Sequence, residues 1–316
     1  MSRNSWFSSL FTRFQFIRSR GSVLCNRQSR LAFEPIELRT LLTTLSVDIA
    51  DPACGDAGNN RYCEIQEAVD AASEGDKIKV HAGTYNPFVV NTNNLTIREA
   101  RRNSNPVVDG DLNAGDENGV EINASGVTIR GLTVQNASGT FFSEGPGFLV
   151  RGSNNTLVGN TANENNRSGF FLTDSEGNTL KGNRARDNEV NGFSIRFNSD
   201  GNTLAGNTAR DNELEGFFLS ISRGNTLIGN RAIGNGGHGF HVHNSDNNTL
   251  TYNRAFHNEG NGYALVNGNN GNLLKHNKAR HNDGWGFLVD AVLANMFDDN
   301  HCHANGLGGS NQPGIC

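Results

Sequence analysis

A repeat of 23 or 24 residues is the feature that most constrains how this chain can fold. Three asparagine positions recur in each of seven successive units and keep a constant spacing from one another. The three series are Asn155, Asn178, Asn202, Asn225, Asn248, Asn272 and Asn295; Asn160, Asn183, Asn207, Asn230, Asn253, Asn277 and Asn300; and Asn165, Asn188, Asn212, Asn235, Asn258, Asn282 and Asn305. Series that stay in phase over seven units indicate a solenoid in which each unit forms one coil.

Within a unit, apolar residues alternate over short stretches bounded by Gly and Asn, as at Leu204, Ala209, Phe217 and Leu219. Period-two alternation is typical of strands, and no unit holds the ten or more residues of period 3.6 that a helical repeat requires. The repeat therefore predicts an all-β fold, a single-stranded right-handed parallel β-helix with coils of about 23 residues. We expect nine or ten coils stacked about 4.8 Å apart, with the regular coils over 153–305.

Stacking the units in register places like residues in columns. The expected inward columns are Phe170, Phe193, Phe217, Phe240, Tyr263 and Phe287, next to Leu172, Ile195, Leu219, Val242, Leu265 and Val289, with Ala162, Ala185, Ala209, Ala232, Ala255 and Ala279 opposite. Asn suits the corners, because it tolerates left-handed backbone angles and its side-chain amides form ladders. We therefore assign the Asn columns a structural role, not a functional one.

A short helix is expected before the first coils. Ile65, Ala68, Val69 and Ala72 fall on one side of it, and Gly75 follows its end. Such a helix would cap the open end of the solenoid, whose strand edge is otherwise exposed.

The repeat unit resembles that of the NosD-like group within the pectin-lyase-like superfamily, over 119–305 at least, and 62–90 is similar to the usual start of such folds. The resemblance implies a parallel β-helix whose functional sites lie on the outer face of one sheet. It does not select a function, because the superfamily contains lyases, hydrolases, epimerases, adhesins and accessory proteins.

The outward positions of the Gly-Phe-x-Leu strand are the natural candidates for a site, because they vary while the inward positions repeat. Rings and cations occur together there, where rings can stack on sugars and cations can pair with carboxylates. The candidate ligand-binding residues are Arg151, Phe171, Arg196, Phe218, His241 and His243. The leading hypothesis is an exported scaffold that binds polysaccharide or another surface component without catalysis.

The first alternative is a polysaccharide-modifying lyase, hydrolase or epimerase. Gly237-His238-Gly239 is similar to a polygalacturonase motif, but His238 fills a slot that varies among the repeats, and the accompanying Asn-Thr-Asp is absent. The adjacent pair Asp298-Asp299 lies in the last coil, so hydrolysis lacks a positioned acid and base. No catalytic residue is assigned from the sequence.

The second alternative is a copper-site accessory protein, which the NosD resemblance suggests. The metal-ligand candidates are His241, His243, His257 and His281. Each pair of these histidines supplies two imidazoles, which are fewer ligands than a closed copper or zinc site needs. Glu164, Asp187 and Asp211 form an acidic column that could attract calcium, although Arg186 and Arg210 alternate with it. We therefore expect no cofactor.

The N-terminal segment is basic and the remainder is acidic. Residues 1–40 carry seven Arg and two Glu, which leaves 20 basic and 30 acidic side chains in the rest of the chain. An acidic body repels phosphate backbones, so a nucleic-acid partner is not expected. The sequence contains no run of 18 apolar residues, so no membrane-spanning helix is predicted. The oligomeric state stays open.

The segment RLAFEPIELRTLLTTLSV, residues 30–47, resembles a short leader of exported surface proteins of planctomycetes and some proteobacteria. The match is carried by Glu34, Pro35, Glu37, Arg39, Leu41 and Leu42. It implies a leader over 1–47, an exported body over 48–316, and an extracellular, cell-surface or periplasmic location.

Cysteine usage agrees with export, because four Cys remain once residues 1–47 are set aside. They form one close pair near each end of the body, Cys54 with Cys63 and Cys302 with Cys316. Four Cys allow three pairings, and the sequence does not choose among them. Local pairing would close two short loops, each worth about 2–4 kcal/mol.

Overall fold

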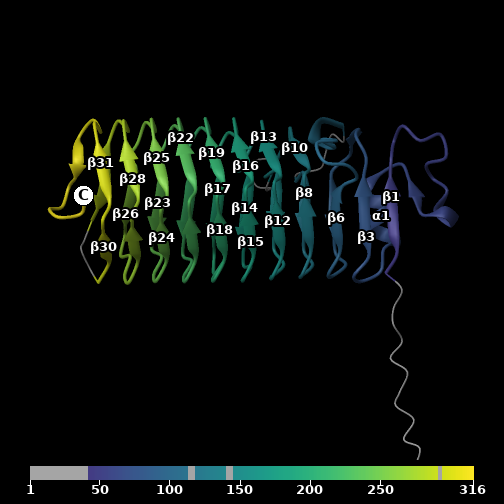
Figure 1. Cartoon of the computed structure of the whole chain (residues 1–316), viewed down its shortest axis with the longest axis horizontal. Coiled ribbons are helices and arrows are strands. Elements are labelled where there is room, and N and C mark those ends of the chain that lie inside the picture. Colours follow the sequence, from purple (N-terminus) through teal and green to yellow (C-terminus); the bar gives the residue numbers. More distant parts are fainter. Residues whose placement is uncertain (1–41, 113–117, 140–144, 291–293) are drawn as a thin grey trace, which may run out of the picture. The chain divides into compact units, whose positions relative to one another are not determined.

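The computed structural model describes residues 42–112, 118–139, 145–290 and 294–316. Over this part of the chain, each coil contributes one strand to each of three parallel sheets, called here sheets A, B and C. Figure 1 shows the coils stacked in sequence order, from purple to yellow. Sheets B and C each have ten strands, which confirms the predicted parallel β-helix of about ten coils.

Sheet A runs along one side of every coil. Its strands, in spatial order, are β2 (Arg61–Tyr62), β1 (Thr44–Val47), β3 (Lys77–Val80), β6 (Thr96–Glu99), β9 (Thr128–Arg130), β12 (Thr156–Val158), β15 (Thr179–Lys181), β18 (Thr203–Ala205), β21 (Thr226–Ile228), β24 (Thr249–Thr251), β27 (Leu273–Lys275) and β30 (Met296–Asp298).

Sheets B and C complete the coil. The strands of sheet B are β4 (Thr84–Tyr85), β7 (Val107–Asp109), β10 (Thr133–Gln135), β13 (Thr161–Asn163), β16 (Arg184–Arg186), β19 (Thr208–Arg210), β22 (Arg231–Ile233), β25 (Arg254–Phe256), β28 (Lys278–Arg280) and β31 (His301–His303). The strands of sheet C are β5 (Phe88–Val90), β8 (Val120–Ile122), β11 (Phe148–Val150), β14 (Phe170–Thr173), β17 (Phe193–Arg196), β20 (Phe217–Ser220), β23 (Phe240–His243), β26 (Tyr263–Val266), β29 (Trp285–Val289) and β32 (Gly308–Ser310).

The predicted inward columns form the core. Phe217 of β20 pairs in register with Phe193 and Phe240, and its ring lies 4.8 Å from each of theirs, nearly parallel to both. Opposite them, Ala209 is fully buried. Glycine is needed at the neighbouring position 192, because a methyl group added there would lie 2.6 Å from the Cβ of Ala209.

The asparagine columns are buried at the corners, as predicted. Asn207 is typical: its Oδ1 accepts from the backbone N–H of Asn183 at 2.8 Å, and its Nδ2 donates to the carbonyl of Leu180 at 2.9 Å and to Oδ1 of Asn230 at 3.0 Å. Each side chain thus satisfies buried backbone groups of the preceding coils and continues a ladder to the next coil. These contacts explain the repeat in structural terms.

The predicted capping helix is α1 (Ile65–Ala71), and two short 3₁₀ turns occur at Ala57–Asn59 and Gly110–Leu112. Glu64 and Glu67 form a capping box at the start of α1, which satisfies free N–H groups of the first turn. The apolar side of α1 is buried against the first strands of the solenoid.

The first strand begins before the predicted boundary at residue 48. Strand β1 pairs with β3, and its residues Leu45 and Val47 are buried. Because these alternating apolar residues continue the inward columns of sheet A, residues 44–47 form a strand of the solenoid that overlaps the end of the predicted leader. Residues 1–41 lie outside the described residues, so the leader prediction for them stays a prediction.

Each end of the body carries one disulfide. Cys54 pairs with Cys63 and Cys302 pairs with Cys316, the local pairing out of the three possible. The second bond holds the C-terminal segment against the last coil, where Ile315 is buried.

Candidate functional site

The outer face of sheet C has the register that the repeat predicts. Phe171 pairs with Ser194, Ser194 with Phe218, Phe218 with His241, and His241 with Ala264, so these side chains form one outward column. The second outward column, two residues further along each strand, is Thr173, Arg196, Ser220, His243 and Val266.

Charged and aromatic side chains gather in three successive coils of this face. We call them the sheet C cluster: Arg196, Glu215, Phe218, His238, His241 and His243. The guanidinium carbon of Arg196 lies 4.6 Å from the centre of the Phe218 ring. On its other side, the Phe218 ring lies 4.9 Å from His241. Phe218 is only 9% exposed, so Arg196 and the histidines cover it, and it does not offer an open face to a ligand.

Glu215 orients His241. The glutamate precedes β20 by two residues, and its Oε1 lies 3.2 Å from Nδ1 of His241 in the next coil. When Nδ1 donates this hydrogen bond, Nε2 of a neutral imidazole is an acceptor. Nε2 is buried and has no hydrogen-bond partner. The pair thus holds one oriented imidazole with an unused nitrogen.

His238 lies beside this pair, in the turn before β23. Its ring meets His241 edge-on at 5.0 Å, and its Nδ1 accepts the backbone N–H of Asn261 at 2.9 Å. Burial lowers the pKa of His238, and the charge of His241 lowers it further, whereas Glu215 opposes the change. The ring is therefore held in its neutral form.

The charges of the cluster are partly removed from water. Burial lowers the pKa of Arg196, against the opposing field of Glu215. Burial alone raises the pKa of Glu215, but the hydrogen bond and charge of His241 outweigh it and the net shift is downward. Glu215 therefore stays ionised. It is hydrogen-bonded to His241 and attracts the more distant Arg196 through its charge.

Of the six predicted binding residues, the structure brings four together: Arg196, Phe218, His241 and His243. The predicted Arg151 instead forms an ion pair with Glu121, at 2.8 Å between Nη1 and Oε1. Phe171 is partly exposed on the same outward column as Phe218, two coils away. The assigned face is thus divided between an ion pair near β11 and the cluster around β20.

Glu215 and His238 belong to the sheet C cluster but are not among the six predicted binding residues. Both fill the slot before the repeat Gly, which is Asn at 191 and 261. Their backbone groups are in register, since Gly216 N–H donates to the His238 carbonyl. This slot forms a third outward column, and it varies among the repeats as the other two columns do. That variation is the sequence signal that points to Glu215 and His238.

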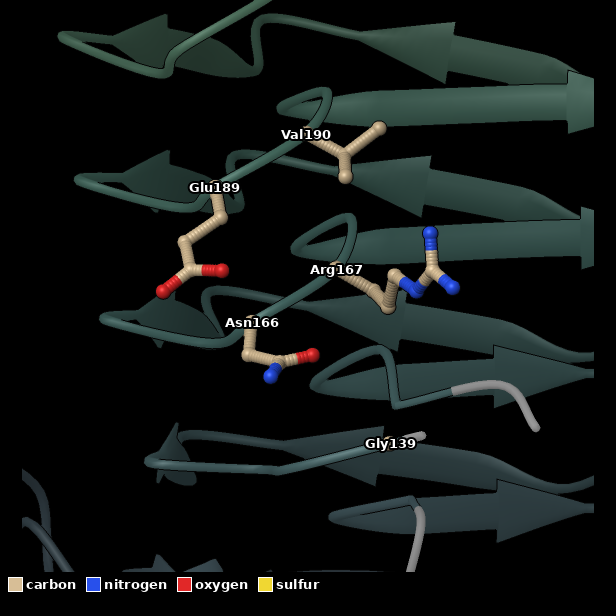
Figure 2. Close-up of a pocket in the computed structure, with 5 residues that line it drawn as sticks. All are labelled: Gly139, Asn166, Arg167, Glu189 and Val190. Atoms are coloured by element: carbon tan, nitrogen blue, oxygen red, sulfur yellow. The ribbon is translucent and has the colours of Figure 1, made fainter. Parts of the chain in front are cut away.

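A pocket of 270 Å³ lies at the corner between sheets B and C, one coil before Glu215. It is lined by Gly139, Asn166, Arg167, Glu189 and Val190 (Figure 2). None of the predicted site residues lines it. Leu214 N–H donates to the Val190 carbonyl, so the pocket edge continues directly into the turn that carries Glu215.

The predicted metal candidates do not assemble into a site. His257 and His281 stack face to face with 5.2 Å between ring centres. In the described part of the chain, no group of three or more His, Cys, Asp or Glu residues could hold a metal ion. In the acidic column, Asp211 pairs with the adjacent Arg210 at 2.9 Å, and Asp187 lies 3.8 Å from the adjacent Arg186.

Acidification tests the neutral state of His238. Because its pKa is lowered in the folded protein, the unfolded chain takes up the proton first, at the usual value of 6.5. Stability is therefore complete above that pH and falls below it. Thermal unfolding followed from about pH 7.5 to about pH 5.5 should show a smaller decrease for His238→Asn, since Asn occupies the same column elsewhere. An equal decrease in both proteins would contradict the assignment.

The three-sheet coil defines a parallel β-helix. Residues 69–254 match the family described as periplasmic copper-binding protein (NosD), and the chain belongs to this family. The copper in that description does not fit the described residues, whose His pairs supply too few ligands in one place. No curated protein sequence matches the chain.

Several solved structures share the fold. Pectate lyase Pel9A is 18% identical with a TM-score of 0.66, covering 85% of this chain and 78% of its own. A rhamnogalacturonan lyase is 15% identical with a TM-score of 0.58, covering 74% and 81%. The A-module of the Azotobacter vinelandii mannuronan C-5 epimerase AlgE6 is 16% identical with a TM-score of 0.52, covering 77% and 82%. At these identities, the likeness concerns the fold.

Proposed function

We propose that this protein is an exported β-helix that binds an acidic polysaccharide on the outer face of sheet C, without catalysis. The observation that carries the proposal is the placement of Arg196 over Phe218. The ring fixes the guanidinium on a rigid sheet, so little side-chain freedom remains to be lost on binding. A partly desolvated arginine is well suited to bidentate pairing with a carboxylate.

Arg196 offers a full positive charge to an anionic ligand despite the acidic body. It is the one arginine of the sheet C cluster, and Glu215 is the cluster's single carboxylate. Glu215 is already engaged by His241. Because exposed charges beyond about 10 Å are largely screened at moderate salt, a carboxylate bound at Arg196 is affected mainly by Arg196 and little by the rest of the acidic body.

Two further observations support the proposal. The solved structures with this fold include enzymes named for pectate, rhamnogalacturonan and mannuronan. The two disulfides favour a location outside the cytoplasm, in line with the family description, which is of a periplasmic protein.

Among the described residues, no helix has the length and apolar character that crossing a bilayer requires.

Retention on immobilised polygalacturonate tests the proposal. Arg196→Gln is expected to weaken retention about tenfold at low salt, the effect of losing one charge-assisted hydrogen-bonding group. The matched control is Arg210→Gln, which removes the same charge from an exposed side chain of sheet B. Equal retention of the parent and Arg196→Gln would place the binding elsewhere. A parent protein that is not retained at all would contradict the proposed function.

One observation favours the enzymatic alternative, namely the oriented imidazole of His241 with its unused Nε2. A histidine that a carboxylate orients in this way is the arrangement of a general base. This reading predicts that the protein releases unsaturated uronate products and that His241→Gln abolishes their release. Absence of product from any uronate polymer that the protein binds would leave binding as the function.

A further inference from the structure

Two residues in the corner that follows sheet C occupy a backbone conformation that suits them poorly. The corner column is Asp174, Phe197, Ile221, Asn244 and Asn267, and its φ angles are 48°, 50°, 54°, 44° and 61°. Asp and Asn adopt the left-handed region readily, whereas an aromatic or β-branched residue there is an outlier. The repeat accommodates Asn at this corner in two other coils, so the geometry itself does not require Phe or Ile.

Both side chains also face solvent. Phe197 is 47% exposed and Ile221 is 44% exposed. In the described part of the chain, no ring contact involves Phe197, in contrast to the inward Phe residues. The two residues thus combine backbone strain with exposed apolar surface, and neither feature stabilises the fold. Strain that the fold does not use is a reason to look for a function.

The two residues are contiguous with the sheet C cluster. Phe197 directly follows Arg196, and Ile221 directly follows Ser220, which pairs in register with Arg196. The backbone N–H of Asn198 donates to the carbonyl of Ile221 at 2.8 Å, so the two corners lie in adjacent coils. An exposed apolar step therefore borders the cation that Phe218 holds in place.

We propose that Phe197 and Ile221 form the apolar floor of a subsite for one uronate residue. The C–H face of the sugar ring lies on Phe197 and Ile221, and its carboxylate pairs with Arg196. This inference rests on the proposed function and narrows it, because exposed apolar side chains next to one cation favour a ring that carries both an apolar face and a carboxylate. A polyanion without such a ring makes only the ionic contact.

Phe197→Asn separates the two roles of the residue. The substitution replaces a strained, exposed ring by the residue that the corner accepts at 244 and 267. It is expected to raise the thermal unfolding midpoint by about 2 °C and to weaken retention on polygalacturonate about fivefold. Retention on polyglutamate, which has carboxylates but no sugar ring, is expected to stay unchanged. Ile221→Asn should act in the same direction with a smaller loss.

The matched control is Tyr252→Asn. Tyr252 is also left-handed, with φ of 57°, and 57% exposed, but it lies at the corner between sheets A and B. Its replacement should leave retention on both polymers unchanged.

Different results would overturn different steps. If the parent is retained on polygalacturonate and Phe197→Asn is retained equally, the subsite is refuted while the proposed function stands. Equal weakening on both polymers would refute the sugar floor, and a lower unfolding midpoint would show that Phe197 serves the fold. A parent that is not retained refutes the proposed function and the subsite with it.

Discussion

Phe217→Ala is expected to lower the free energy of unfolding by about 3–5 kcal/mol, the usual effect of truncating a fully buried aromatic ring. Phe217 has no exposed surface. Its ring lies between those of Phe193 and Phe240 at 4.8 Å on each side. Alanine would leave a cavity in the middle of the stack, and the neighbouring coils are too tightly hydrogen-bonded to close it. Urea unfolding followed by circular dichroism measures the loss.

Two neighbouring phenylalanines provide a graded control. Phe218→Ala should cost less than Phe217→Ala, because Phe218 is covered only by side chains of the outer face. Phe197→Ala should change stability by less than about 0.5 kcal/mol, as is usual at an exposed position. Similar losses at 217 and 197 would contradict the inward and outward assignment of the coil.

The repeat predicts which residues are neighbours across coils, but not how their side chains turn. Parallel strands in register place residue i beside its counterpart about 23 positions later, so the columns through Phe217, Phe218 and Arg196 could be written from the sequence. The contact of Arg196 with Phe218 depends on a rotamer, and the Glu215–His241 hydrogen bond joins different columns across a corner. Neither follows from the repeat period alone.

The N-terminal coils show a second limit. Strands β3, β6 and β9 pair like those of the later coils, yet the regular asparagine pattern begins only at 153. Coils that lack the asparagine ladder cannot be recognised as repeats in the sequence. Strand β1 also overlaps the predicted leader, because its buried residues Leu45 and Val47 lie in the same apolar stretch as the leader motif.

Asn207→Leu is expected to destabilise the solenoid by about 2–5 kcal/mol, although the two side chains have nearly the same shape. The substitution leaves the buried N–H of Asn183 without an acceptor and the carbonyl of Leu180 without its side-chain donor. Each buried polar group that loses its partner costs about 1–3 kcal/mol. Because Asn207 also links the amides of Asn183 and Asn230, the ladder is interrupted there.

The control for this substitution is Asn270→Ala. Asn270 is exposed, and it donates a hydrogen bond to Oδ1 of Asp246 from its backbone N–H, so its side chain should contribute little. A loss for Asn207→Leu no larger than for Asn270→Ala would mean that the buried ladder is dispensable. The expected large difference would instead show that asparagine is needed at the corners because the backbone groups of the preceding coils have no other partner. The recurrence of Asn every 23 or 24 residues then follows from the hydrogen bonds that each corner requires.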